Sequence, residues 1–390
     1  MAGYEMDDNK RSSFLGSQSA SAVSYHRNIW EWEASAKKTR CPLVEDRYVT
    51  PFDFGGTAVY EPPKGIEQKI HPHLMPYKLQ PADGYVAVIP SGRVWGRSGS
   101  ILSPDGKLIF DLSPEYDGQE NRMLTPEEHP ALAWRNEQHL RQFHGTAAAL
   151  TFCGSYNYFH WLYDVLPRLS MLQTLNNLYD RLIMNPNPYR SFVEETLTML
   201  GIPESSVIRT DANFNIQADR LIVPSIMMNS HYPPWTTSTL RSLLMPKRDC
   251  GLATPERVYI SRRKASVRRI INEDEVIRCL EAFGFVSICL EDWTMAQQIQ
   301  LFASARAIAG PHGAGLANLA FCQAGIQVIE IFHIRHIVPT YWMISNHNKL
   351  DYYMLYGQEL ESSPNCYPGL EDYSVDTERL KQTLHLAGMS

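Results

Sequence analysis

Several features that mark common classes of protein are missing from this chain of 390 residues. No apolar run approaches the roughly 18 residues of a membrane-spanning helix, and the opening, MAGYEMDDNKRSSFLG, is too polar for a signal peptide. Basic residues are not in excess, since 36 Lys and Arg stand against 42 Asp and Glu, giving a formal net charge of −6. We therefore expect no nucleic-acid partner, no transmembrane segment and a cytoplasmic location.

Cysteine is scarce and scattered. An odd, unclustered set with no C-x-x-C pair indicates reduced core thiols rather than a disulfide framework or a zinc site. The seven are Cys41, Cys153, Cys250, Cys279, Cys289, Cys322 and Cys366.

The common catalytic signatures are missing as well. The chain contains no G-x-S-x-G, no G-x-G-x-x-G and no Walker loop. No Asp-x-Asp occurs, which counts against a catalytic Mg²⁺ or Mn²⁺ clamp. Neither His71 with His73 nor His333 with His336 has a Cys or carboxylate partner at zinc-site spacing. We expect no metal and no cofactor.

What is present is an ordinary globular composition, 44% hydrophobic and 20% charged, with a length that suggests about two or three domains. Residues 1–25 are polar and predict a flexible leader. Residues 26–145 predict a Pro-rich wrap followed by a small antiparallel β meander, with strands at 85–90, 93–96 and 107–113 and a Ser-Pro-Asp-Gly turn at 103–106.

Residues 146–248 predict an N-terminal Rossmann-like half. Strands are expected at 147–153, 181–185 and 220–227, and helices at 157–175 and near 190–200. Asn157 is placed to cap the first helix, and Pro167 is placed to kink it.

Residues 249–345 predict a C-terminal Rossmann-like half. Capping-box spacing, at Asn272 with Glu275 and at Thr294 with Gln297, marks the starts of two helices. The alternation of strands and helices predicts a parallel, doubly wound sheet. Residues 346–390 are expected to form an extension that packs back on the N-terminal half. The strands of the C-terminal half are expected at 258–261, 285–290, 305–310 and 327–332.

Ligands of an open parallel sheet bind at the carboxyl ends of its strands, and a Pro-His-Gly-Ala-Gly turn and Glu330 fall at that edge. The two glycines let backbone N–H groups approach an anion, although a tight turn around a satisfied histidine has the same sequence. Glu330 offers two oxygens to ribose hydroxyls, unless it is a solvated strand-end carboxylate. The candidate nucleotide-binding residues here are His312, Gly313, Ala314, Gly315 and Glu330.

A basic cluster, RRKASVRRIIN, follows the first strand of the same half. It contains Arg262, Arg263, Lys264, Arg268 and Arg269. Guanidinium groups suit bidentate binding of a diphosphate, whereas the alternative is a solvated loop. Its position at the ligand edge of the sheet favours binding.

In the first half, His160, Asp164 and Arg168 lie at i, i+4 and i+8 on one stripe of a predicted helix. A carboxylate beside an imidazole can take a proton from an attacking hydroxyl. The alternative is an Asp–Arg pair with a core histidine.

Four segments together resemble family 61 glycosyltransferases. They are YNYFHWLYDVLPRL at 156–169, RRIINEDEV at 268–276, EDWTMAQQIQLFASARAIAGPHGAGLANLAF at 291–321 and QVIEIF at 327–332. The similarity covers roughly 145–335. The family includes plant xylan-decorating enzymes, animal protein O-linked N-acetylglucosaminyltransferases and bacterial proteins of capsular polysaccharide synthesis. Unlike many relatives, this sequence shows no N-terminal membrane anchor.

The resemblance implies a GT-B-like α/β fold, in which two Rossmann-like parallel-sheet halves face each other across a cleft, here with a small β-rich N-terminal segment. It also implies inverting transfer of a sugar, without a metal, from a nucleotide donor, typically UDP-linked. The acceptor would be a hydroxyl of a glycan or polysaccharide intermediate. The alternatives are a nucleotide-sugar-binding protein without transferase activity and a GT-B-like epimerase or hydrolase.

Site roles follow from the same resemblance. The half at 249–345 would hold the nucleotide sugar, through the 312–315 turn and Glu330, while Arg268 or Arg269 neutralises the diphosphate. The half at 146–248 would receive the acceptor. There, Asp164, oriented by His160, would act as general base. Asn157 and Arg168 complete the expected acceptor side.

Overall fold

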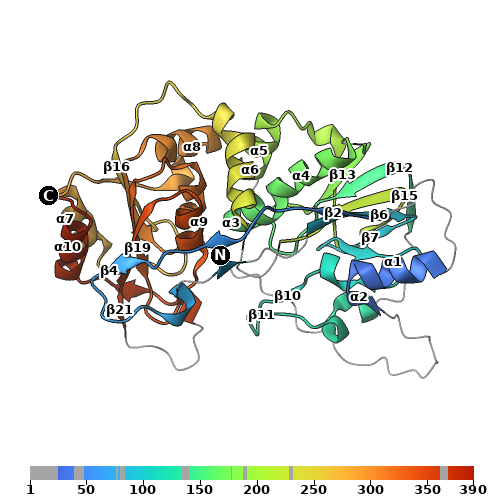
Figure 1. Ribbon diagram of the computed structural model, residues 1–390, viewed down its shortest axis with the longest axis horizontal. Coiled ribbons are helices and arrows are strands. Elements are labelled where there is room, and N and C mark those ends of the chain that lie inside the picture. Colours follow the sequence, from blue (N-terminus) through green and yellow to red (C-terminus); the bar gives the residue numbers. More distant parts are fainter. Residues whose placement is uncertain are drawn as a thin grey trace.

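The computed structural model describes residues 25–38, 48–75, 78–79, 84–133, 140–176, 178–187, 191–227, 232–360 and 368–390. Within them the chain forms two α/β halves that lie side by side (Figure 1). The predicted leader at 1–25 falls outside the described residues except for Tyr25, which begins a two-residue strand, β1 (Tyr25–His26).

The first half is built on four parallel strands in the order β15-β12-β13-β14. The helical run after β12 covers this sheet and carries the candidate acceptor-side residues. The strands are β12 (Arg141–Ala149), β13 (Arg181–Met184), β14 (Val207–Arg209) and β15 (Asn215–Pro224). The helices are α3 (Tyr158–His160), α4 (Leu166–Leu172), α5 (Ser191–Met199) and α6 (Pro234–Leu244).

The N-terminal strands run antiparallel and extend this sheet. β6 (Gly84–Pro90) and β7 (Arg93–Trp95) both pair antiparallel with β15, and β7 continues into β8 (Ser100–Leu102) and β9 (Leu108–Ile109). All but the last residue of β6 is buried, so this strand is covered on both faces. The turn at 103–106 forms as expected.

The second half is an entirely parallel sheet of six strands in the order β17-β16-β18-β19-β20-β4. The strands are β16 (Arg257–Ile260), β17 (Val286–Ile288), β18 (Ala307–Pro311), β19 (Gln327–Phe332), β20 (Asp351–Tyr356) and β4 (Lys64–Gly65). The helices are α7 (Glu273–Glu281), α8 (Met295–Ser304), α9 (Thr340–His347) and α10 (Thr377–Leu386), with a 3₁₀ segment at Ala314–Phe321.

One of the two predicted capping boxes forms. Thr294 and Gln297 make both reciprocal bonds at the start of α8. Asn272 lies at the start of α7 without capping it, because its side chain bonds the backbone of Val375 through both its oxygen and its nitrogen. A tertiary contact therefore replaces the local one.

The expected packing of residues 346–390 on the N-terminal half is wrong. β20 is a buried strand of the second sheet, and α10 packs against α7 and β20. Leu380 and Leu384 of α10 share a hydrophobic cluster with Val276 of α7. These residues complete the second half.

The segment that does cross between the halves is the Pro-rich stretch at 48–75, which we call the strap. Its β2 (Val49–Phe52) pairs with β6 in the first sheet, and its β4 pairs with β20 in the second. In Figure 1 the blue β4 lies among the orange and red elements of the second half. The Trp342 indole N–H also donates to the Glu61 carbonyl at 2.7 Å. The strap therefore ties the two halves together.

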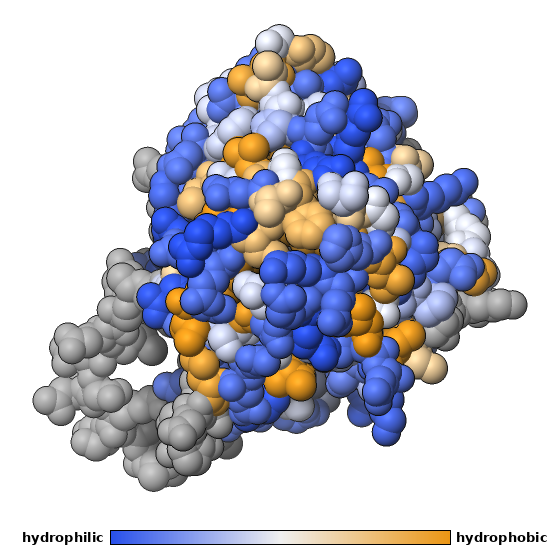
Figure 2. All heavy atoms as spheres, turned by 90° about the vertical axis from the view of Figure 1, so that its left-hand side faces the viewer, coloured by the Kyte–Doolittle hydropathy of each residue, from blue (hydrophilic) through white to orange (hydrophobic). Residues whose placement is uncertain are grey.

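The distribution of hydrophobic side chains between core and surface is that of a globular protein. One hydrophobic cluster runs through both halves, from Val86 and Leu166 in the first to Phe302 and Trp342 in the second. Seen from the side of the second half, hydrophilic side chains cover most of the face, with hydrophobic ones scattered among them (Figure 2). Within the described ranges, no helix is both long enough and apolar enough to cross a membrane.

Candidate active site

A cavity of about 530 Å³ opens between the two halves. It lies where the loops after β12 and β15 meet the loops after β16, β18 and β19. The strand order reverses between β12 and β15 in the first sheet and between β16 and β18 in the second. Ligands of open α/β sheets usually bind at such a reversal. Of the predicted site residues, the cavity is lined by Asn157, His160, Asp164, Arg268, His312, Gly313 and Ala314.

On the first-half side, His160 and Asp164 form a hydrogen-bonded pair. Nδ1 of His160 lies 2.7 Å from Oδ2 of Asp164, and the Tyr232 hydroxyl donates to the same oxygen at 2.9 Å. The Asp164 side chain is 1% exposed, whereas that of His160 is 39% exposed. The imidazole therefore faces the cavity, and the carboxylate lies behind it.

This arrangement does not fit the predicted role of Asp164 as the group that meets the acceptor. Both of its oxygens accept hydrogen bonds from Tyr232, and one also contacts His160. A carboxylate so placed orients the histidine ring. Tyr232 was not predicted, although it follows the strand expected at 220–227 and so lies at the ligand edge of the sheet.

Local structure explains how the ring reaches the cavity. Asn157 caps the helix as predicted, accepting a bond from the Phe159 N–H at 2.9 Å. The helix then widens into a π turn at Trp161–Val165, just before Pro167. π turns often occur at functional sites. Gly154 leaves room for the ring, because a Cβ there would lie 3.1 Å from Cδ2 of His160.

Arg168 does not belong to the acceptor side. It is fully buried, and its guanidinium donates to the carbonyl oxygens of Ala149, Thr151 and Pro224 at the ends of β12 and β15. Burial lowers the pKa of Arg168 to about 10, and the charges of Asp164 and Tyr85 oppose that shift. Its role is to fasten the helix to the two strands.

On the second-half side, the arginines of the basic cluster have different partners. Arg268 lines the cavity and donates to the Gly369 carbonyl at 2.9 Å; its φ of 55° turns the backbone sharply at this point. Arg269 instead pairs with Asp372, and Arg263 pairs with Asp274. Of the two arginines proposed for the diphosphate, the structure places only Arg268 at the cavity.

Arg262 packs under the glycine turn. A Cβ on Gly313 would lie 2.1 Å from Nη1 of Arg262, so only glycine lets the guanidinium approach this backbone. Arg262 also donates to the Val267 carbonyl at 2.9 Å. Gly315 lies against Leu290, with a hypothetical Cβ at 2.8 Å, and does not line the cavity.

Glu330 is 0% exposed, so the predicted direct contact with ribose does not fit. Its Oε1 lies 2.5 Å from Nδ1 of His312, and its Oε2 accepts a bond from the Tyr352 hydroxyl at 2.5 Å. The His312 ring stacks on Phe332 and lines the cavity above the carboxyl. Glu330 acts on the cavity only through His312.

Burial sets the protonation of this second pair. It raises the pKa of Glu330 to about 8 and lowers the pKa of His312 well below its usual value, with Arg268 and Arg262 adding to the latter effect. At neutral pH the carboxyl is therefore mostly protonated and the imidazole neutral. A protonated carboxyl donates to Nδ1 and leaves Nε2–H of His312 as a donor.

Metal ligation is not suggested by the side chains. Across the part of the chain that the structure describes, no three His, Cys, Asp or Glu residues are grouped to hold a metal ion. Among the described side chains, the positively charged one that lines the cavity is the guanidinium of Arg268.

Two α/β halves share one cavity at the carboxyl ends of their strands, where ligands of such sheets bind. Residues 158–329 match the family model described as Glycosyltransferase 61. The resemblance predicted from the sequence is thus confirmed: these residues are a family 61 glycosyltransferase domain, and the chain is a transferase enzyme. No curated protein matches the chain.

Proposed function

We propose that this enzyme is an inverting glycosyltransferase of GT-B-like architecture, which transfers a sugar from a UDP-linked donor to a hydroxyl of a glycan. The observation that carries the proposal is the His160–Asp164 pair at 2.7 Å, with the imidazole open to a cavity whose other wall holds Arg268 and His312.

The second half suits the donor. Arg268, the Nε2–H of His312 and the backbone at Gly313 and Ala314 line its side of the cavity. Guanidinium and N–H donors stabilise the charge that grows on a departing diphosphate, which is the part a metal plays in other enzymes. These groups support a metal-independent reaction.

The first half suits the acceptor. Asp164 accepts the Nδ1–H of His160, which leaves Nε2 of the imidazole to take a proton. As the acceptor oxygen attacks C1 of the donor sugar, the bond from C1 to the diphosphate oxygen breaks. The electron pair leaves with UDP, and the acceptor proton passes to His160. A single displacement of this kind inverts the anomeric centre.

The test is His160→Ala, measured as sugar transfer and as UDP binding by calorimetry. Loss of a positioned base lowers kcat by about 10²-fold or more, while UDP affinity stays within about twofold because the second half holds the nucleotide. His144→Ala is the matched control, since His144 is exposed on β12 and does not line the cavity.

Wild-type turnover in His160→Ala would end the assignment of the base. Product analysis by NMR separates transfer from the alternatives: free sugar indicates a hydrolase, and an epimerised nucleotide sugar indicates an epimerase. UDP binding with no product from any acceptor would indicate a binding protein.

A further inference from the structure

The mouth of the cavity carries three exposed side chains that the proposed chemistry does not use. Tyr116, Met123 and Tyr156 are 42%, 38% and 47% exposed, and all three line the cavity. We call them the rim. Exposure of such large apolar groups costs free energy, so their gathering around one cavity indicates a ligand.

The rim comes from two separate segments. Tyr156 follows β12, within the helix-bearing loop that also holds His160. Tyr116 and Met123 pair with each other across a hairpin of β10 (Tyr116–Asp117) and β11 (Arg122–Met123). In Figure 1 this hairpin reaches from the first half toward the line between the two halves. The rim thus continues the acceptor side of the cavity.

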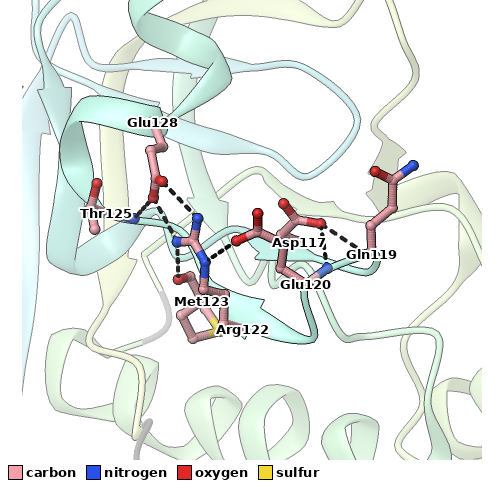
Figure 3. A network of polar contacts seen from close by, with 7 residues as sticks. All are labelled: Asp117, Gln119, Glu120, Arg122, Met123, Thr125 and Glu128. Atoms are coloured by element: carbon pink, nitrogen blue, oxygen red, sulfur yellow. Dashed lines mark hydrogen bonds and ion pairs between the residues drawn. The ribbon is translucent and has the colours of Figure 1, made fainter. Parts of the chain in front are cut away.

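The hairpin holds its side chains in place through one arginine (Figure 3). Arg122 makes a bidentate pair with Glu128, with both bonds at 2.7 Å, and bonds Glu120 at 2.5 Å. Glu128 also accepts the Thr125 N–H, and Asp117 accepts two N–H groups of the turn. A surface fixed in this way binds with little loss of conformational entropy.

The electrostatic character of the hairpin is negative. Residues 115–128 contain five carboxylates and one guanidinium. One of them acts at the cavity wall: burial raises the pKa of Cys153 to about 12, and the charge of Glu115, together with that of Asp164 from the first half, adds to that effect. An anionic ligand would therefore be repelled from this side of the cavity.

We propose that the rim is the acceptor subsite and that it takes a neutral saccharide. This inference rests on the proposed glycosyl transfer. The C–H face of a sugar ring packs on the electron-rich face of Tyr116 or Tyr156, with Met123 beside it. The side chain of Asn157, which lines the cavity beside Tyr156, can donate a hydrogen bond to its hydroxyls. A chain seated there extends one hydroxyl toward His160.

The experiment measures binding of xylotetraose and cellotetraose to the UDP-loaded protein and to the unliganded protein, by calorimetry and saturation-transfer NMR. Tyr116→Ala and Tyr156→Ala are expected to weaken binding of the preferred tetrasaccharide about tenfold each. Tyr116→Trp and Tyr156→Trp are expected to retain it. UDP affinity is expected to be unchanged in all four variants.

The matched control is Trp30→Ala, which removes an aromatic ring 44% exposed on α1 (Ile29–Lys38), outside the cavity lining. Tetragalacturonate and a Ser/Thr-containing peptide are titrated as the competing ligand classes. Preference for either of them, no binding of neutral tetrasaccharides, or unchanged binding in both Ala variants would each overturn the acceptor subsite. The proposed function itself fails if the protein does not bind UDP, or if His160→Ala transfers sugar as fast as the wild type.

Discussion

At the scale of residues, the cavity holds two histidine–carboxylate pairs in different surroundings. Asp164 accepts a hydrogen bond from Tyr232 and lies against His160, which suits a histidine that takes a proton. Buried Glu330 has its pKa raised to about 8, which suits a histidine, His312, that donates one. Acid and base roles are commonly assigned from surroundings that push the pKa values of similar groups apart.

Glu330 makes stability depend on pH. Because burial raises its pKa from the usual 4.5 to about 8, the folded state holds a proton that the unfolded state has lost. Its contribution is fully present below pH 4.5 and is lost as the pH rises through about 8. Several buried histidines have lowered pKa values and add an opposite slope. Relative to a variant that cannot titrate at position 330, the free energy of unfolding should therefore fall by about 2 kcal/mol between pH 6.5 and 8. Urea denaturation at several pH values measures this.

Glu330→Gln is the matched variant. Its amide donates to Nδ1 of His312 and accepts from Tyr352, as the protonated carboxyl does, but does not titrate. We expect the fall caused by Glu330 to be missing from the variant, and we expect its transfer activity to persist at pH 9. If the free energy of unfolding of the variant depends on pH in the same way as that of the wild type, the titrating group is not Glu330.

Arg268 should carry the charge of the diphosphate. Arg268→Met is expected to weaken UDP binding by about 10- to 100-fold, measured by calorimetry, because it removes a charge-assisted contact. Arg269→Met is the control, since Arg269 pairs with Asp372 away from the cavity.

EDTA should leave transfer unchanged; activity lost with EDTA and restored by Mn²⁺ would contradict this account.

At the scale of elements, both the local sequence pattern and tertiary contacts determine the structure of the helical run at 157–175. The Asn157 cap and the helical stripe form as expected, but the run is interrupted by the π turn at Trp161–Val165. The run is then held to the sheet by Arg168, whose partners are three carbonyl groups. The spacing at i, i+4 and i+8 predicted one functional stripe. The structure gives Arg168 a different partner set from the other two residues.

Arg168→Met should therefore destabilise the fold without affecting the nucleotide site. Buried carbonyl groups lose their donors, which lowers the free energy of unfolding by about 3 kcal/mol, measured by urea denaturation. Arg263→Met, at an exposed ion pair, should change it by less than about 0.5 kcal/mol. Equal effects of the two changes would contradict the fastening role.

At the scale of the whole molecule, the strap and the inter-half contacts join the two sheets. Glu67 of the strap pairs with Arg379 of α10, with both bonds at 2.7 Å, and the Tyr158 hydroxyl of the first half donates to Asn318 of the second at 2.7 Å. With one hydrophobic cluster through both halves, we expect a single cooperative unfolding transition.

Binding of UDP should move that single transition. At a concentration 100 times its Kd, UDP adds about 2.7 kcal/mol, which corresponds to a rise in Tm of about 3 °C for a chain of this size. Differential scanning calorimetry with UDP and, as a control, with uridine measures the shift. Two transitions, with only one shifted by UDP, would show that the halves unfold independently.

The sequence by itself determined the family, the parallel sheet of the second half and the positions of most loops that line the cavity. The family comes from the resemblance of four segments to known relatives. The sheet and the loop positions follow from local information, because hydrophobic periodicity sets strands and helices and the carboxyl ends of parallel strands share one edge. His160, Arg268 and the turn at 312–315 were found in this way.

Only the tertiary structure decided which polar groups face the cavity and which lie behind it. Burial depends on contacts between residues far apart in the chain, so spacing alone could not show that Asp164 is covered by Tyr232, or that Glu330 lies between His312 and Tyr352. For the same reason it could not place β20 in the second sheet, or bring the hairpin at 116–123 to the cavity mouth.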